Sequence, residues 1–295
     1  MMIDAQLLAA PLLDHRGLDL DSAASVTYVL EQSFRYEYAE PVTALRQRLV
    51  AVPKPRHGSQ YRRAHLVEVS GAPARRSTHR DAHGNNVVRV RADSVASAIE
   101  FRVAAVIERV RDGSAAGLPA EALRSPRLLR ATPLTRASEQ LVALAGDLTD
   151  GRLTPVEKAD QICALVHGAL AYEYGPTTVR TTAAEALAGG AGVCQDFAHV
   201  MLALCHIVGL PARYVSGHLL GQGGTHAWVE VIVPSGSAAT VAAFDPCNGG
   251  RASSAYVTIA TGRDYSDVAP TSGSYIGTAR ATLTTQRRVG VLAAA

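Results

Sequence analysis

The stretch "GGAGVCQDFAHVMLALC" (Gly189–Cys205) places a cysteine between a glycine-rich loop and an apolar helix. Its three glycines let the backbone turn sharply, and apolar residues recur at helical spacing from Phe197 to Val208. Gly209 and Pro211 then supply the usual signals for the end of a helix. The pattern predicts that Cys194 lies at or next to a helix N-terminus. Two interpretations stay open at this point, a buried core cysteine and a nucleophile.

The composition indicates a globular protein and argues against nucleic-acid binding and metal binding. The chain has 295 residues, 47% hydrophobic and 19% charged, which is typical of a globular protein with a sizeable core. The formal net charge of +3 is too small, and the arginines are too scattered along the sequence, to indicate a nucleic-acid partner. The four cysteines show neither a CxxC pair nor a Cys/His ligand spacing, so we expect no metal site and no cofactor.

The N-terminal residues favour a cytoplasmic protein. Asp4 stands where a secretory signal would be basic, and Pro11 interrupts the apolar stretch. No apolar run approaches membrane-spanning length, so we expect no membrane partner. In a reducing compartment the cysteines are free thiols.

Two domains are predicted. Residues 25–110 alternate apolar and polar side chains with turn signals between the segments, which indicates antiparallel sheet with one solvated face. Glycine, serine, alanine and proline then mark a linker near residues 111–125. We therefore place an antiparallel β domain at residues 22–112 and a second domain at residues 125–295.

The second domain begins with helices and continues with strands. Thr154 and Glu157, and again Thr182 and Glu185, have the spacing of a capping box at a helix start. Three probable strands follow the Cys194 helix, "ARYVSGHLL", "THAWVEVIV" and "TVAAFDP". Helices followed by antiparallel strands predict an α+β fold.

A candidate base and its partner come from the last two of these strands. The strands are joined by the turn-forming segment "PSGSAA". If the turn is centred between Ser235 and Gly236, His226 and Asp245 lie directly opposite each other on one face of the hairpin. A carboxylate beside one imidazole nitrogen leaves the other free to accept the proton of a thiol.

The Cys194 thiol needs a neighbouring base to act as a nucleophile. A helix N-terminus favours the thiolate through its free N–H groups and its dipole, and those N–H groups also suit an oxyanion. Asp196 works against the thiolate unless it is engaged elsewhere. Each residue also has a structural interpretation: His226 as a surface or core histidine, and Asp245 as the start of a turn. Their coincidence with a cysteine at a helix start favours a catalytic triad.

Longer motifs carry a family resemblance. "GVCQDFAHVMLALCHIVGLPARYVSG", "THAWVEV" and "FDPCNG" resemble the three core motifs of transglutaminase-like proteins. "RYEYAEPVTALRQRLVAVPKP" and "DAHGN" resemble the β domain that precedes this core in many bacterial members, and "GRDYSDVAP" resembles the stretch that follows it. The resemblance implies an N-terminal antiparallel β domain followed by a papain-like core, in which helices pack on an antiparallel sheet.

The resemblance also implies a mechanism. Cys194 is then the nucleophile, His226 the general base and acid, and Asp245 its orienting partner. An amide carbonyl of a peptide or protein substrate forms a thioester on Cys194, and the acyl group passes to an amine or to water. We expect a cysteine peptidase, amidase or transglutaminase activity, with a slight preference for hydrolysis. The sequence contains no acidic cluster with EF-hand-like spacing, so it gives no indication of calcium dependence.

Three further residues have open roles. Gln195 either positions a carbonyl or faces solvent in the first helical turn, and Trp228 either walls the substrate cleft or packs in the core. Cys247 stands where such proteins usually carry a small hydroxyl residue. The rivals are a non-catalytic binding or scaffold protein that retains the fold, and an arylamine-type acetyltransferase, for which the sequence offers no phosphate-binding loop.

Overall fold

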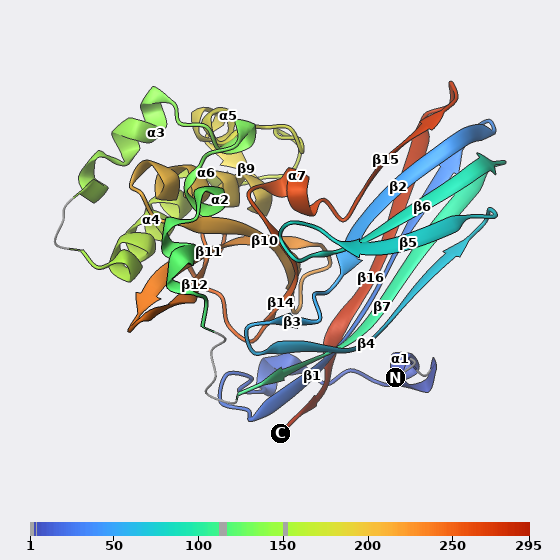
Figure 1. The fold of residues 1–295 in the computed structure, drawn as a ribbon, viewed down its shortest axis with the longest axis horizontal. Helices are drawn as coiled ribbons and strands as arrows, with labels where there is room; N and C mark the ends of the chain where they lie inside the picture. The colour runs from blue at the N-terminus through green and yellow to red at the C-terminus, as the bar shows by residue number, and fades with distance from the viewer. Residues whose placement is uncertain (1–2, 4, 112–116, 150–152) are drawn as a thin grey trace.

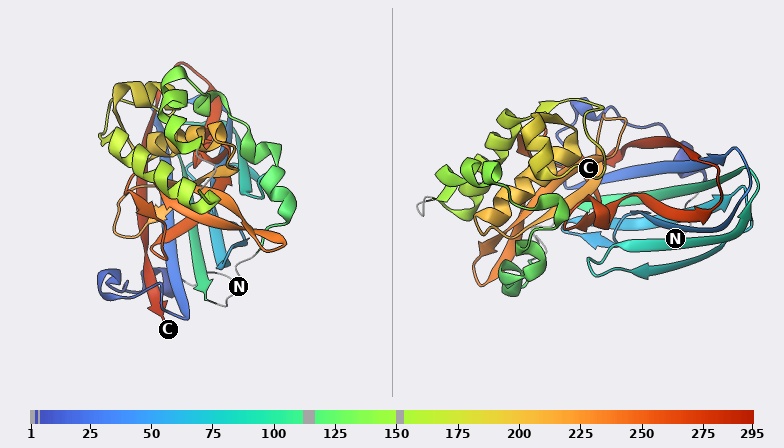
Figure 2. Two further views of the ribbon diagram at one scale, coloured as in Figure 1. Left: turned by 90° about the vertical axis from the view of Figure 1, so that its left-hand side faces the viewer. Right: turned by 90° about the horizontal axis from the view of Figure 1, so that it is seen from above.

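The alternating residues of the N-terminal half form a β sandwich in the computed structural model, which describes residues 3, 5–111, 117–149 and 153–295 (Figure 1, Figure 2). The first sheet has the order β16 (Ala281–Ala294), β1 (Ser25–Tyr38), β7 (Ala98–Val110), β4 (Gln60–Ser70) and β3 (Arg56–His57). The second has the order β15 (Thr271–Ile276), β2 (Val42–Val52), β6 (Asn86–Val95) and β5 (Arg75–Arg80). The inward-facing residues of the two sheets, such as Phe34, Leu45, Val90 and Phe101, share one core.

The last two strands belong to this sandwich. β16 pairs with β1 along its whole length, and β15 pairs with β2. The predicted range of residues 125–295 for the second domain therefore requires a correction, because residues 271–294 return to the first domain. The linker predicted near residues 111–125 lies partly outside the described residues; its described part contains a short bridge from Leu118 to Ala239.

The second lobe is an antiparallel sheet covered by helices on one face, as predicted. Its order is β13 (Gly250–Arg251), β12 (Ala238–Asp245), β11 (His226–Ser235), β10 (Ala212–Leu219) and β14 (Tyr256–Gly262). A short parallel pair joins β8 (Ala171–Tyr172) to β9 (Ala191–Gly192).

The helices are short apart from two. They are α1 (Ala5–Ala9), α2 (Pro126–Leu129), α3 (Glu139–Leu144), α4 (Pro155–Ala169), α5 (Ala183–Gly189), α6 (Cys194–Ile207) and α7 (Tyr265–Val268), with 3-10 turns η1 (His15–Gly17), η2 (Ala120–Arg124), η3 (Pro133–Thr135) and η4 (Gly146–Thr149). Both predicted capping boxes are confirmed at the starts of α4 and α5. Among the described residues, no helix is both long and apolar enough to cross a bilayer.

Successive side chains of β11 point to opposite faces of the sheet and contact different parts of the protein. Ala227, Val229 and Val231 pack in the core that contains α6. His226, Trp228 and Glu230 point to the opposite face, because side chains alternate along a strand. On that face Glu230 meets His57 of the β sandwich, with 2.7 Å between Oε1 and Nε2.

Two amide side chains of the sandwich connect it to β14. Gln60 donates to the carbonyl oxygen of Thr258 at 2.7 Å and accepts from its N–H at 3.0 Å. Asn85, the last residue of "DAHGN", makes the same pair with Thr261, at 2.8 and 2.9 Å. Each side-chain amide thus bonds to both backbone groups of one β14 residue, as a neighbouring strand would. The motif "DAHGN" therefore has a structural role between the lobes.

We expect Asn85→Ala to lower the free energy of unfolding by about 2–4 kcal/mol, because the buried N–H and carbonyl groups of Thr261 lose their partners. Urea unfolding can be followed through Trp228, the single tryptophan, which lies in β11 of the second lobe. Ser77→Ala, at an exposed position of β5, is the control. Equal stability of the two variants would contradict this role of Asn85.

Candidate active site

Cys194 is the first residue of α6, as predicted. α5 is followed by its C-cap residue Gly190, whose φ of 67° is left-handed and suits glycine. The chain then runs through β9 and enters α6 from Val193, which has extended backbone angles. Because the first N–H groups of a helix have no partner within it, the tip beside the half-buried Cys194 offers donors to an oxyanion.

The carboxylate of Asp196, two residues after Cys194, is engaged in hydrogen bonds of its own. Its Oδ2 accepts from the N–H of Val193 at 2.8 Å and from the hydroxyl of Thr177 at 2.7 Å, so the carboxylate caps the helix. Burial raises the pKa of Asp196 in spite of these hydrogen bonds. The hydrogen bonds and the raised pKa both weaken the electrostatic repulsion between Asp196 and a negatively charged sulfur.

His226 and Asp245 are in contact, but the predicted register is wrong by two residues. Ser235 lies opposite Ala238, so the turn is centred between Gly236 and Ser237, and the φ of 58° at Gly236 allows a tight two-residue loop. His226 and Asp245 are therefore diagonal neighbours. Because a shift of two keeps each side chain on its face, His226 Nε2 still lies 2.7 Å from Asp245 Oδ2.

Asp245 accepts hydrogen bonds from several donors in addition to His226. Tyr256 donates its hydroxyl to Oδ2 at 2.8 Å, and Asn248 donates its side-chain amide to the same oxygen at 2.6 Å. The N–H groups of Cys247 and Asn248 donate to Oδ1 at 2.9 and 3.2 Å. Burial alone would raise the pKa of Asp245, but the hydrogen bond from His226 and the other donors lower it. The carboxylate thus stays charged.

The imidazole lies between the carboxylate and the thiol. Burial alone would lower the pKa of His226, but side-chain hydrogen bonds with Asp245 and Cys194 outweigh it and raise the pKa to about 9. Since Nε2 faces Asp245, Nδ1 is the nitrogen left for the sulfur. The arrangement favours a proton on the ring at neutral pH, which is what a thiolate–imidazolium pair requires.

Sequence profiles place this site in a known family. The profile described as "Transglutaminase-like superfamily" matches residues 142–246, and that described as "Bacterial transglutaminase-like N-terminal region" matches residues 28–108. Together the matched residues make up more than half of the chain. The chain belongs to the transglutaminase-like superfamily.

Uncharacterized mycobacterial proteins and a solved bacterial structure are similar to this chain. An uncharacterized protein of Mycobacterium tuberculosis is 28% identical over 273 residues, covering 83% of this chain and 82% of its own. One from Mycobacterium leprae is 37% identical over 118 residues, covering 37% of this chain and 40% of its own. The crystal structure of a Cytophaga hutchinsonii protein, proposed to be a cysteine protease, is 22% identical, covers 91% of each chain and has a TM-score of 0.73, which shows the fold.

Gln195 and Trp228 are both buried side chains of the second lobe. Gln195 is 7% exposed, and its amide donates to the carbonyl oxygen of Thr178 at 3.4 Å. Trp228 is 1% exposed and stacks on His226, with ring centroids 6.3 Å apart. Tyr256 packs edge-on against the same indole at 5.4 Å. Trp228 is therefore placed to orient the imidazole.

Two exposed tyrosines lie near Cys194 and were not predicted from the sequence. Tyr172 lies opposite Gly192 in the β8–β9 pair and contacts Tyr174 edge-to-face at 5.5 Å. Partial burial, Tyr174 and then Cys194 raise the pKa of Tyr172, so its phenol lies within electrostatic reach of the sulfur. Their exposed fractions, 51% and 79%, leave an aromatic surface beside the site. Two tyrosines flanking one residue in "AYEYG" are the only sequence signal.

Cys247 is a second thiol near the site. Burial, with the charges of Asp245 and Cys194, raises its pKa to about 12, so it remains protonated at neutral pH. Cys163 and Cys205 are buried, and all four cysteines are free. In the part of the chain that the structure describes, no three His, Cys, Asp or Glu side chains come together as a metal site would need.

Replacing Cys247 with serine should leave turnover and the alkylation of Cys194 within about twofold of wild type. A protonated thiol contributes little that a hydroxyl of similar size does not. Intact mass after brief treatment with iodoacetamide would show one added group in both proteins. Loss of that group in Cys247→Ser would assign the reactive thiol to Cys247 instead.

Proposed function

We propose that this protein catalyses thiol-dependent chemistry at amide bonds, with Cys194, His226 and Asp245 as its triad. The observation that carries the proposal is the His226 ring, 2.7 Å from Asp245 on one side and hydrogen-bonded to the Cys194 side chain on the other. A non-catalytic scaffold would have no need of this buried, charged arrangement.

The reaction follows from the groups that are present. The Cys194 thiolate attacks the carbonyl carbon, and the oxyanion accepts hydrogen bonds from N–H groups at the tip of α6. His226 donates its proton to the departing amine as the C–N bond breaks, which leaves a thioester. The neutral ring then takes a proton from water or from an amine, which displaces sulfur and yields an acid or a new amide.

We infer hydrolysis as the main outcome. Cys194 is half-buried, and the side chains beside it at Tyr172 and Tyr174 are open to solvent, so water reaches the thioester. An amine acceptor would need its own binding site to compete with water.

Intact-mass trapping tests this proposal. Wild type and Cys194→Ala are incubated with a panel of glutamine-containing and simple peptides, with and without a primary amine. We expect an acyl adduct on wild type alone, and release of the free acid. Release of the amide of the added amine would assign transamidation instead. No adduct and no turnover with any peptide would contradict the proposal.

The tyrosine pair predicts a preference for substrates with an aromatic or aliphatic side chain next to the scissile amide. Tyr174→Ala should raise KM several-fold and leave kcat within about twofold, because the ring gives binding that is equal in ground and transition states. Steady-state kinetics on matched peptides would measure this. A fall in kcat with unchanged KM would assign Tyr174 to the chemical step.

A further inference from the structure

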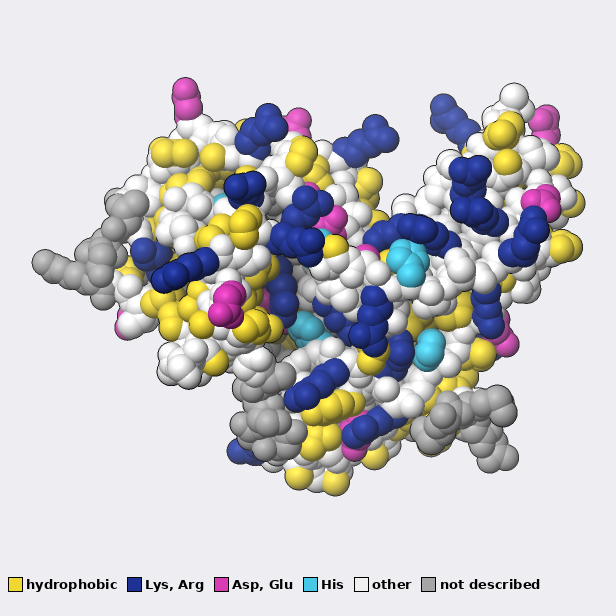
Figure 3. Space-filling view, viewed as in Figure 1, with side chains coloured by type: hydrophobic (Ala, Val, Ile, Leu, Met, Phe, Trp, Pro, Cys, Tyr) yellow, Lys and Arg dark blue, Asp and Glu magenta, His cyan; other side chains and the backbone are white. Residues whose placement is uncertain are grey.

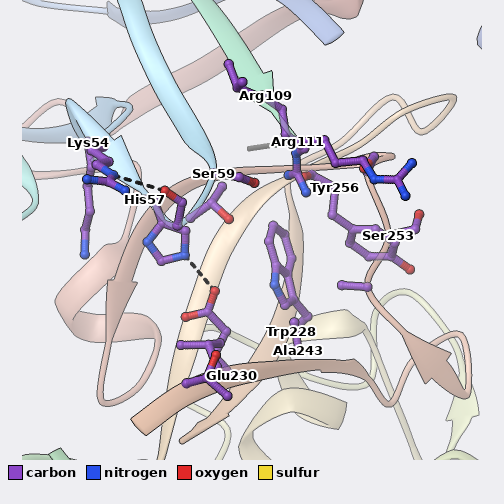
Figure 4. A pocket seen from close by; sticks show the side chains of 18 of the residues that line it. Lys54, His57, Ser59, Arg109, Arg111, Trp228, Glu230, Ala243, Ser253 and Tyr256 are labelled. Atoms are coloured by element: carbon purple, nitrogen blue, oxygen red, sulfur yellow. Dashed lines mark hydrogen bonds and ion pairs between the residues drawn. The ribbon is translucent and has the colours of Figure 1, made fainter. Parts of the chain in front are cut away.

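A cavity of about 900 Å³ lies between the catalytic sheet and the β sandwich. Trp228, Glu230 and Tyr256 line it from the sheet, while Lys54, His57 and Arg109 come from the sandwich (Figure 4). Cys194, His226 and Asp245 are not among its lining residues. It is therefore separate from the triad, with Trp228 and Tyr256 between the two.

The cavity is strongly basic. Two carboxylates line it, Asp21 and Glu230. Against them stand the side chains of Lys54, Arg56, Arg80, Arg109, Arg111 and Arg213. Figure 3 shows Lys, Arg and His side chains gathered where the two lobes meet. These arginines come from distant parts of the sequence. The scatter that argued against a nucleic-acid partner therefore does not prevent basic side chains from gathering in space.

The two carboxylates already have partners. Glu230 accepts from Arg213 at 2.6 Å and contacts His57 at 2.7 Å. Asp21 accepts from the N–H of Ser254 at 2.8 Å. Neither balances the remaining arginines.

In the described part of the chain, the remaining arginines are not paired with carboxylates. Among the described residues, Arg56, Arg80, Arg109 and Arg111 form no ion pair with a carboxylate. Arg109 donates from Nη2 to the carbonyl oxygen of Tyr256 at 2.7 Å, and its buried Nε has no partner. Burial and the charge of Arg213 lower the pKa of Lys54 to about 8, as a positive environment does.

We propose that this cavity binds a small anion with two or more negative charges, carried by phosphate or carboxylate groups. The volume is that of a small-molecule site and too small for a folded partner. Guanidinium groups bind both oxyanions through paired hydrogen bonds. Several of them around one space select for multiple charges.

Such a ligand would lie one side chain away from the triad. Arg109 holds the backbone of Tyr256, and the hydroxyl of Tyr256 holds Asp245 at 2.8 Å. The proposal concerns binding alone, and it does not rest on the proposed function.

Calorimetric titration of the full-length Cys194→Ser variant with inorganic tripolyphosphate and with citrate tests it, since turnover plays no part. We expect saturable binding of one ion per chain for at least one probe. Arg80→Gln and Arg111→Gln should each weaken that affinity about tenfold, the usual effect of losing one charged hydrogen-bond donor.

Arg75→Gln is the matched control. Arg75 lies on β5 like Arg80, but its side chain is 82% exposed and outside the cavity. Tighter binding of tripolyphosphate would identify a phosphate-bearing ligand, and tighter binding of citrate a polycarboxylate. Absence of saturable binding by both probes would overturn the proposal, and so would an equal loss of affinity in Arg75→Gln.

Discussion

Replacing His226 with alanine should slow the alkylation of Cys194 by iodoacetamide about 100-fold at pH 6.5. Only the thiolate reacts, and an unassisted cysteine thiol with a pKa of about 8.5 is about 1% thiolate at that pH. In wild type, the raised pKa of His226 favours a protonated ring, and a positive ring beside a sulfur stabilises negative charge on it. Turnover of any amide substrate should fall further, by about 1,000-fold or more, because the leaving amine loses its proton donor.

The pH profile has a definite sign. The pKa of His226 is raised to about 9, so the imidazolium is present below that pH and is lost above it. Wild type should therefore alkylate quickly through the neutral range, whereas the variant should gain reactivity only as pH rises. The two rates should converge near pH 10, where an unassisted thiol with a pKa of about 8.5 is ionised.

Two variants control the measurement. His79→Ala changes a histidine of β5, outside the triad, and should keep the wild-type profile. Cys194→Ala should remove the labelled site and so confirm which sulfur is measured. Identical profiles for wild type and His226→Ala would refute the role of the imidazole.

Local signals in the sequence predicted the catalytic helix well. The capping boxes before α4 and α5, the glycine loop and the start of α6 at Cys194 depend on residues within a few positions of one another. The triad face was also predictable, because alternation fixes the face of a strand even when its register is uncertain. The two-residue error in register arose because the position of the turn depends on which residue adopts positive φ, and only the structure places Gly236 there.

Long-range pairings were not predictable in the same way. Alternation predicts a strand but not its partner, so nothing in residues 281–294 indicates that they pair with β1 rather than with the catalytic sheet. Tyr256 was missed for the same reason, since its link to Asp245 joins two strands that are not neighbours in the sheet. Asn248 was missed although it lies only three residues after Asp245 and its contact is local. The interpretation of "DAHGN" as a family signature likewise gave no hint that Asn85 binds Thr261.

These long-range contacts connect the sandwich to the active site. Gln60, Asn85 and Arg109 bind the backbone of β14 at Thr258, Thr261 and Tyr256. Tyr256 in turn fixes Asp245. The position of Asp245 therefore depends on a domain that carries none of the three proposed triad residues. Loosening the contacts between this domain and β14 should affect activity as well as stability.

Gly192→Ala should lower kcat/KM and the rate of Cys194 alkylation at pH 6.5 by about 100-fold. A Cβ at position 192 would lie 2.7 Å from Cβ of Asp196 and 2.7 Å from its Oδ2, well inside contact distance. Asp196 cannot swing aside cheaply, because Oδ2 holds both the N–H of Val193 and the hydroxyl of Thr177. Relief of the clash must move the tip of α6, and a displacement of about 1 Å at a reacting atom costs about 100-fold in rate.

Gly189→Ala separates this effect from a general cost of losing glycine. Gly189 lies in α5, three residues earlier, and a Cβ there meets nothing within 4 Å. It should retain wild-type alkylation and turnover. Trp228 fluorescence in urea should report a loss of about 2 kcal/mol for Gly192→Ala alone, the usual cost of an overpacked site. If the two alanine variants react with iodoacetamide at equal rates, the close packing of Gly192 on Asp196 does not position the nucleophile.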